Sequence, residues 1–249
     1  MFSSRSAQPP QVRLAAMAQS MTELRGEAFA ADSAVLEAMR DEAAKLRHDL
    51  DQLDGALLVA LTRNDPDVPQ GLDLSLRVPF WQTEALPGAW SCPGNGTYLA
   101  AGMTLFHDCP LAEIGLRQAA QATAAPFGLE LDVFGFEGTY LSIAVDLPAH
   151  CATGLTTDHI LQVDTQNRRD PERAILVRLN IQAGPNTVQM LRTLSGEGET
   201  GSVEFDLAYS EIGDSPAEKL WLDILFENPA YSRAKIADMW VTRRRRAEI

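Results

Sequence analysis

"PFGLELDVFGFEGTYLSIAVDLP", residues 126–148, decides the fold class of this chain. Apolar and polar side chains alternate on both sides of Glu137-Gly138, over residues 128–136 and again over 139–147. Successive side chains of a β-strand point to opposite faces, so a period of two predicts two strands, each with one buried face. The short Glu137-Gly138 link predicts that the two strands form a hairpin.

The same alternation recurs along most of the chain. It predicts further strands at residues 71–78, 97–108, 112–118, 158–165, 173–182, 202–210, 219–226 and 234–243, with a turn at 184–186. About ten short strands without helices between them are typical of an antiparallel sandwich or barrel. We therefore expect a mainly β fold, a jelly-roll-like antiparallel β-sandwich over residues 71–249, preceded by a helical segment.

That helical segment, expected over residues 10–61, carries two sets of apolar residues spaced by three and four. The sets are Leu14, Met17, Met21, Leu24 and Ala28, and then Leu36, Met39, Ala43, Leu46, Leu50, Leu53 and Leu57. Such spacing is the a/d pattern of a coiled coil, and the two sets are out of phase. Three arrangements follow: a hairpin folded near residues 29–33, a long helix that joins other copies, or a second helix packed on the β domain.

"TRNDPDVPQG", residues 62–71, is rich in turn formers and predicts the domain boundary.

Composition limits which partners the protein is expected to bind and in which compartment it is expected to lie. The net charge of −13 argues against nucleic acid or an anionic membrane as the main partner, because phosphate binding needs a basic surface. The run Arg243 to Arg246 is interpreted as a solvated tail. There is no secretory h-region and no apolar run long enough to span a membrane, and Cys92, Cys109 and Cys151 form no C-x-x-C motif. We expect three thiols in a soluble, cytoplasmic protein.

"LFHDC", residues 105–109, raises the question of a catalytic centre. In a strand His107 and Asp108 point to opposite faces, and only Cys109 shares the face of His107. Met103 and Leu105 lie on the same face and are apolar, which predicts a buried strand end. The four histidines show no metal-ligand spacing, and no G-x-S-x-G or phosphate-binding glycine loop occurs. We expect no catalytic residue, no metal and no cofactor, which favours a protein that is not an enzyme.

The polar residues that alternate with the core positions give the candidate ligand-binding set. They are Tyr140, Arg178, Asn180, Gln182, Glu204, Asp206, Trp221 and Asp223. If their strands share one sheet, an aromatic ring lies among planar amide, carboxylate and guanidinium groups, the chemistry that stacks and hydrogen-bonds a sugar. The alternatives are a solvated face or one covered by the helices or another subunit. Glu204 and Asp206 also suit a hydrolase that needs two carboxylates.

Several segments in order resemble a family of uncharacterised bacterial proteins known only as a domain of unknown function. They are "LFHDC", "PFGLELDVFGFEGTYLSIAVDLP", "RLNIQAGPNT", "VEFDLAYS", "WLDILFENP" and "SRAKIADMWVTRRRRAE", within residues 100–249. The ending "KLWLDILFENPAYSRAKIADMWVTRR" is also similar to the closing hairpin of jelly-roll carbohydrate-binding modules of the galactose-binding-like type. The first resemblance implies no activity. The expected function is non-catalytic recognition of a carbohydrate or glycan-bearing surface. The alternatives are a structural or adaptor protein that forms homo-oligomers through its N-terminal helices and, less favoured, a carbohydrate-active hydrolase.

Overall fold

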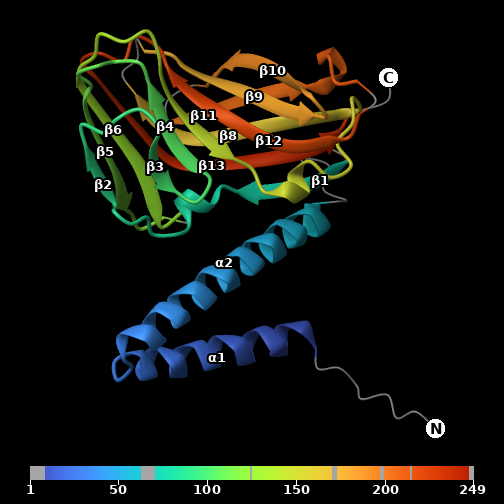
Figure 1. Ribbon diagram of the computed structural model, residues 1–249. Helices are drawn as coiled ribbons and strands as arrows, with labels where there is room; N and C mark the ends of the chain where they lie inside the picture. Colours follow the sequence, from blue (N-terminus) through green and yellow to red (C-terminus); the bar gives the residue numbers. More distant parts are fainter. Residues whose placement is uncertain are drawn as a thin grey trace. The chain divides into compact units, whose positions relative to one another are not determined.

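Two helices precede two β-sheets in the computed structural model, which describes residues 9–62, 71–123, 125–169, 173–196, 199–213 and 215–246 (Figure 1). The chain divides into two compact units, Met1–His48 and Asp49–Ile249. The predicted boundary at residues 62–71 falls almost entirely outside the described residues and stays a prediction.

Helix α1 spans Pro10–Ala28 and helix α2 spans Ser33–Thr62. The side chain of Asp32 accepts a hydrogen bond from the Val35 N–H at the start of α2. The three arrangements expected for the helical segment stay predictions. No residue of α1 is buried. Within the described parts of the chain, neither helix has a stretch long and apolar enough to cross a bilayer.

The strands form two antiparallel sheets, which confirms the predicted sandwich. The seven-stranded sheet has the order β11-β8-β13-β6-β5-β2, with β1 also paired to β13. Its members are β1 Leu72–Arg77, β2 Ala89–Ser91, β5 Glu113–Ala120, β6 Phe127–Gly135, β8 His159–Arg169, β11 Thr200–Asp206 and β13 Ser232–Arg245. The six-stranded sheet has the order β10-β9-β12-β7-β4-β3. Its members are β3 Thr97–Ala100, β4 Met103–His107, β7 Leu141–Asp146, β9 Ile175–Ala183, β10 Asn186–Thr193 and β12 Ala217–Phe226.

The predicted hairpin at Glu137-Gly138 is wrong. β6 belongs to the seven-stranded sheet and β7 to the six-stranded sheet, so the link crosses from one layer to the other. Asp108 holds this crossing, because its carboxylate accepts the backbone N–H groups of Thr139 and Tyr140 at 2.7 and 3.1 Å. The later strands also alternate between the sheets, as in a jelly roll, except that β9 and β10 are neighbours in the six-stranded sheet.

Other strand predictions need smaller corrections. The turn at residues 184–186 is confirmed, because β9 and β10 pair across it and Gly184 has a φ of 57°. The predicted strand 97–108 is two strands, β3 and β4, joined by a turn in which Gly102 has a φ of 73°. Two strands, β2 and β10, were not predicted.

The core lies between the sheets and contains the apolar residues that alternate with the predicted polar positions of β9, β11 and β12. None of these residues is more than 8% exposed: Ile175, Val177, Leu179, Ile181, Val203, Phe205, Leu207, Leu220, Leu222, Ile224 and Phe226. Period two identifies them because each strand has one face against the opposite sheet.

The arginine run is not the solvated tail that we expected. β13 continues to Arg245, and Arg243 is only 8% exposed. Its Nε donates to the carboxylate of Asp73 at 2.8 Å, and its Nη1 donates to the carbonyl oxygens of Cys151 and Thr153 at 3.0 and 2.9 Å. The prediction failed because these partners come from segments distant in sequence, which a local charge pattern does not reveal.

Candidate functional site

The outer side of the six-stranded sheet, here called the Trp221 face, brings most of the predicted ligand-binding residues together. Arg178, Asn180 and Gln182 lie on β9, and Trp221 and Asp223 lie on the adjacent strand β12. The register places Trp221 opposite Asn180 and Asp223 opposite Arg178. Residues directly opposite on neighbouring strands point to the same side, so these five side chains share one face.

Tyr140 immediately precedes β7, the strand on the other side of β12. By alternation it lies on the same side of its strand as Ser142, which is opposite Leu225 of β12. Six of the eight predicted residues are thus carried by three neighbouring strands. The prediction assumed that all the strands with candidate residues belong to one sheet, and among them only β11 belongs to the other sheet.

Asp223 is the centre of a polar network on this face. Its Oδ2 accepts hydrogen bonds from Nε of Arg178 at 2.9 Å and from Nδ2 of Asn180 at 2.8 Å. The guanidinium also lies 2.8 Å away through Nη2. Charge-assisted bonds of this kind fix the plane of the guanidinium, so Arg178 is held in place before any ligand arrives.

This network has a buried part and a part that solvent can reach. Asn180 is completely buried and Asp223 is 6% exposed, although both belong to the outer side of the sheet. The side chain of Arg178 is 36% exposed. The Oδ1 atom of Asn180 is buried and has no hydrogen-bond partner among the described residues. Asn180 and Asp223 therefore position Arg178, which presents its charge to solvent.

Three exposed aromatic rings lie on or beside the same sheet: Tyr98 at 61%, Tyr140 at 41% and Phe106 at 38%. Tyr98 of β3 is opposite Thr104 of β4, and Phe106 follows Thr104 by two residues, so both rings point outward. Our sequence reasoning missed both. The signal was available, because Phe106 alternates with the inward Leu105 and His107.

A second charged pair flanks Trp221. Nζ of Lys219 lies 5.6 Å from the centroid of the Trp221 ring and 2.8 Å from Oδ1 of Asp146. The side chains of Lys219 and Asp146 are 48% and 49% exposed. Trp221 therefore lies between the fixed Arg178 network and a solvent-accessible ion pair.

Glu204 and Asp206 lie apart from the Trp221 face. They belong to β11 at the edge of the seven-stranded sheet. Oε1 of Glu204 is 2.8 Å from Nη2 of Arg244, and Oδ2 of Asp206 is 3.3 Å from Nε of Arg246. The fold thus separates these two carboxylates from the other six predicted residues and engages each with an arginine.

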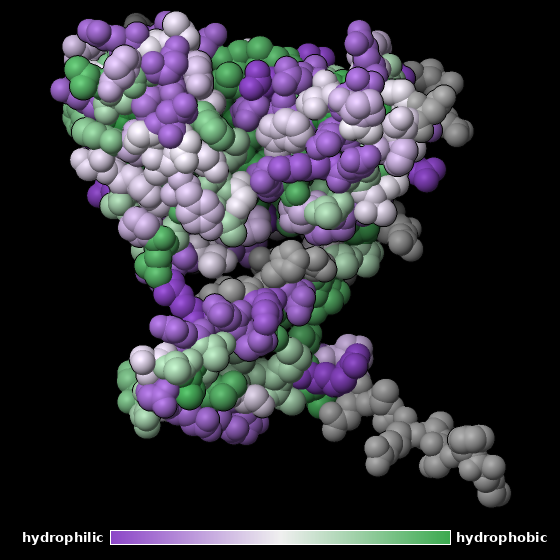
Figure 2. Space-filling view, in the orientation of Figure 1, coloured by the Kyte–Doolittle hydropathy of each residue, from purple (hydrophilic) through white to green (hydrophobic). Residues whose placement is uncertain are grey.

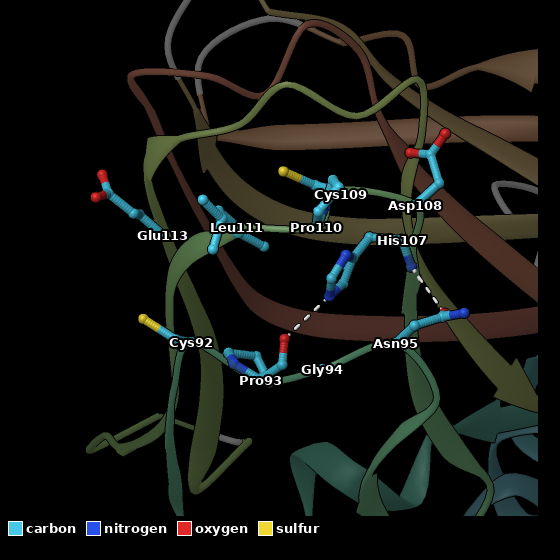
Figure 3. A pocket seen from close by; sticks show the side chains of 11 residues that line it. Cys92, Pro93, Gly94, Asn95, His107, Asp108, Cys109, Pro110, Leu111 and Glu113 are labelled. Carbon is cyan, nitrogen blue, oxygen red and sulfur yellow. Dashed lines mark hydrogen bonds between the residues drawn. The ribbon is translucent and has the colours of Figure 1, made fainter.

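The His-Asp-Cys segment borders a cavity of about 640 Å³ between residues 92–95 and 107–113 (Figure 3). His107 and Cys109 are 4% and 5% exposed, as the buried strand end predicts. Asp108 points to the other side and anchors the crossing to β7. A hydrogen bond from the Thr139 hydroxyl, together with backbone N–H bonds from Tyr140 and Thr139, keeps the pKa of Asp108 below its ordinary value.

The contacts of His107 are those of a structural residue. Its Nε2 lies 2.9 Å from the carbonyl oxygen of Pro93, which can only accept, so Nε2 carries the proton. Figure 3 shows the ring directed toward Pro93. The Cys109 sulfur accepts the backbone N–H of Glu137 at 3.3 Å, and no bond joins it to His107. The thiol–imidazole pair that nucleophilic catalysis needs is absent from the hydrogen bonds of the described residues.

All three cysteines are free thiols, as predicted. Cys92 is exposed, whereas Cys109 and Cys151 are buried. Burial raises the pKa of the Cys151 thiol to about 11, against the opposing charge of Arg243. A thiol in that state is protonated and inert at neutral pH. Among the described residues, no three His, Cys, Asp or Glu side chains gather to hold a metal ion.

A family model described as a family of unknown function, DUF6478, matches residues 3–249. The chain belongs to this family. The match covers the helical segment as well as the residues 100–249 that carry the sequence resemblance. No curated protein matches the chain.

Solved structures with a similar arrangement of strands are distant. A family 11 carbohydrate-binding module from Clostridium thermocellum, in complex with a mixed-linked tetrasaccharide, is 9% identical over 59% of this chain and 92% of its own, with a TM-score of 0.38. The CBM22-1 xylan-binding domain of Paenibacillus barcinonensis Xyn10C is 10% identical over 67% and 98%, with a TM-score of 0.34. A cyclase from Fischerella sp. TAU is 11% identical over 70% and 100%, with a TM-score of 0.42. At these values the likeness assigns no ligand.

Proposed function

We propose that this protein binds a carbohydrate, free or on a glycan-bearing surface, through the Trp221 face and does not turn it over. The observation that carries the proposal is the pairing of exposed aromatic rings with a prearranged Arg178–Asp223–Asn180 network on one side of one sheet. Rings stack on the C–H faces of a pyranose, and planar polar groups exchange hydrogen bonds with its hydroxyls.

Each group has a defined part in this proposal. Trp221 supplies the stacking surface, and Arg178 donates to ring hydroxyls from a guanidinium that Asp223 already holds. The exposed Tyr140 and Asp146 and the half-buried Gln182 extend the surface along neighbouring strands. Because Asp223 holds the Arg178 guanidinium, little conformational entropy is lost on binding, which favours affinity.

Tryptophan fluorescence tests the proposal. We expect saturable changes in emission when the full chain is titrated with a panel of oligo- and polysaccharides, and a loss of about fivefold in affinity in Trp221→Phe, from about 1 kcal/mol of stacking energy. Trp240→Phe, which removes a tryptophan from the opposite sheet, is the matched control and keeps the wild-type affinity. The proposal is wrong if Trp221→Phe binds the responding sugar as tightly as wild type, or if no member of the panel responds.

A second candidate function, self-association through the helices, has its own observation. The apolar residues of the two predicted stripes are largely exposed, and Figure 2 shows hydrophobic residues at the surface of the helical segment. Eight of them are between 39% and 46% exposed: Leu14, Met17, Met21, Leu24, Leu36, Leu50, Leu53 and Leu57. A stripe at heptad spacing buries its surface against another helix, so we propose that copies of this chain associate through it.

Light scattering coupled to gel filtration tests this association. We expect an oligomer for the full chain and a monomer for the double variant Leu50→Glu and Leu57→Glu, because two charges per chain enter the helical seam. Val35→Glu is the control, since Val35 is 47% exposed but lies outside the stripe. A wild-type monomer at high protein concentration contradicts the second candidate.

A further inference from the structure

The outer side of the seven-stranded sheet has a cavity of about 390 Å³ where β8, β11 and β13 lie side by side. Asp164, Ser202, Asp238 and Trp240 are among the residues that line it. No lysine or arginine is among its described lining residues. The register places Trp240 directly opposite Asp164, and Asp164 opposite Ser202. The cavity thus combines an aromatic ring, carboxylates and hydroxyl groups.

Asp164 differs from most carboxylates of this sheet. Six others each form an ion pair with an arginine or a lysine: Asp73, Glu130, Asp132, Glu204, Asp206 and Asp238. Asp164 forms no ion pair with any described residue; Glu113, the first residue of β5, is the other exception. The hydrogen-bond donor to Asp164 is the neutral amide of Gln162, whose Nε2 lies 2.8 and 3.0 Å from the two carboxylate oxygens of Asp164.

Asp238 and Trp240 of the cavity both contact Arg77 of β1. Nε of Arg77 donates to Oδ1 of Asp238 at 3.0 Å, and the guanidinium lies 4.2 Å from the centroid of the Trp240 ring. The charge of Asp238 is therefore balanced within the protein, whereas that of Asp164 is not. The cavity carries one uncompensated negative charge beside a ring of fixed orientation.

We propose that this cavity binds a small organic amine. The ammonium group, which has three donors, forms a charge-assisted pair with Asp164 and bonds to the hydroxyl oxygen of Ser202. The carbon chain of the amine packs against Trp240. The net charge of −13 on the chain attracts cations and repels anions. This site uses neither the residues nor the sheet of the proposed glycan site, so the two proposals stand or fall separately.

Calorimetric titration of the full chain with diaminobutane, and with butanediol as its uncharged analogue, tests the inference. We expect saturable binding of the diamine and binding of the diol weaker by at least about tenfold, because a charged hydrogen bond is lost. Asp164→Asn lowers the affinity for the diamine by a similar factor, and Trp240→Phe lowers it by a smaller one. Asp132→Asn, a carboxylate of the same sheet that Arg233 engages, is the matched control and leaves the affinity unchanged.

Three results overturn the inference: no saturable heat with the diamine, equal affinity for diol and diamine, or wild-type affinity in Asp164→Asn. Thermal unfolding of each variant shows whether it is folded, and Trp240→Phe provides the test if Asp164→Asn is not. Trp221→Phe is expected to retain diamine binding even where it loses a sugar, which separates this result from the proposed function.

Discussion

The two sheets each place a tryptophan near an arginine–aspartate pair on the outer side, but they enclose that pair to different depths. In the seven-stranded sheet, the side chains of Arg77 and Asp238 are 14% and 8% exposed, and the guanidinium lies 4.2 Å from the centroid of the Trp240 ring. In the six-stranded sheet, the side chain of Arg178 is 36% exposed and that of Asp223 is 9% exposed. Arg77 is enclosed by contacts within the protein, whereas Arg178 keeps N–H donors that a ligand can reach.

Strand register causes the difference. Arg77 of β1 is directly opposite Trp240 of β13, so its side chain crosses the ring to reach Asp238 two residues away. Arg178 of β9 is directly opposite Asp223 of β12 and reaches it without crossing Trp221. The same three residue types thus give a closed cluster in one sheet and a more open one in the other. Exposure is then the variable that decides how much each pair contributes to stability.

The largest effect is expected for Asp238→Ala in the closed cluster. This change removes the acceptor of both the Arg77 guanidinium and the Met239 N–H. Breaking a buried ion pair from one side costs about 3 kcal/mol or more, so the free energy of unfolding should fall by about that amount. Urea denaturation measures it. Asp238→Asn, which keeps an acceptor for the Met239 N–H, should lose less, and equal losses in the two variants would show that charge is not the cause.

An intermediate effect is expected for Asp223→Ala in the open cluster. The guanidinium of Arg178 can turn to water, but the completely buried amide of Asn180 loses its shortest hydrogen bond. The amide keeps only its longer bonds to the carbonyl oxygens of Arg178 and Trp221, at 3.3 and 3.4 Å. A hydrogen bond to a charged group contributes about 1.5–3 kcal/mol, and we expect a loss of about 2 kcal/mol from the same denaturation measurement. The double variant Asp223→Ala with Asn180→Ala should cost less than the sum of its parts, because the two residues share this bond. A loss as large as that of Asp238→Ala contradicts the exposure gradient.

Both clusters show what sequence can and cannot supply. Period two identified the inward residues of β9 and β12 and placed Trp221 outward, because alternation is a local property of a strand. The same reasoning applied to "DMWVT", residues 238–242, would have placed Trp240 outward beside Asp238. The order of strands in the sheets is not local. For that reason alternation grouped Glu204 and Asp206 with Trp221, and the short Glu137-Gly138 link gave no sign of crossing between layers.

The ion pairs between strands also depend on strand order, which the sequence does not reveal. Arg244 meets Glu204 and Arg77 meets Asp238 across strands that lie far apart in the chain. Neither partner can be found from a charge run or a spacing, because long-range pairing decides which residues become neighbours. The fold class was therefore predictable from sequence, and the Trp221 face only in part. The amine cavity, which depends on three strands at once, was not.

The smallest effect is expected for Lys219 and Asp146, a more exposed pair than either arginine–aspartate pair compared above. Their side chains are 48% and 49% exposed, and an ion pair in water gains little over its solvated parts. Lys219→Ala should change the free energy of unfolding by less than about 0.5 kcal/mol. Because Lys219 Nζ lies 5.6 Å from the Trp221 ring, the same variant should still alter tryptophan emission and weaken any sugar bound there. A matched substitution at Lys45, which pairs with Glu42 on the helical segment, should change neither emission nor affinity. If Lys219→Ala destabilises the protein as much as Asp223→Ala does, exposure does not rank these pairs, and the division between a closed and an open cluster fails.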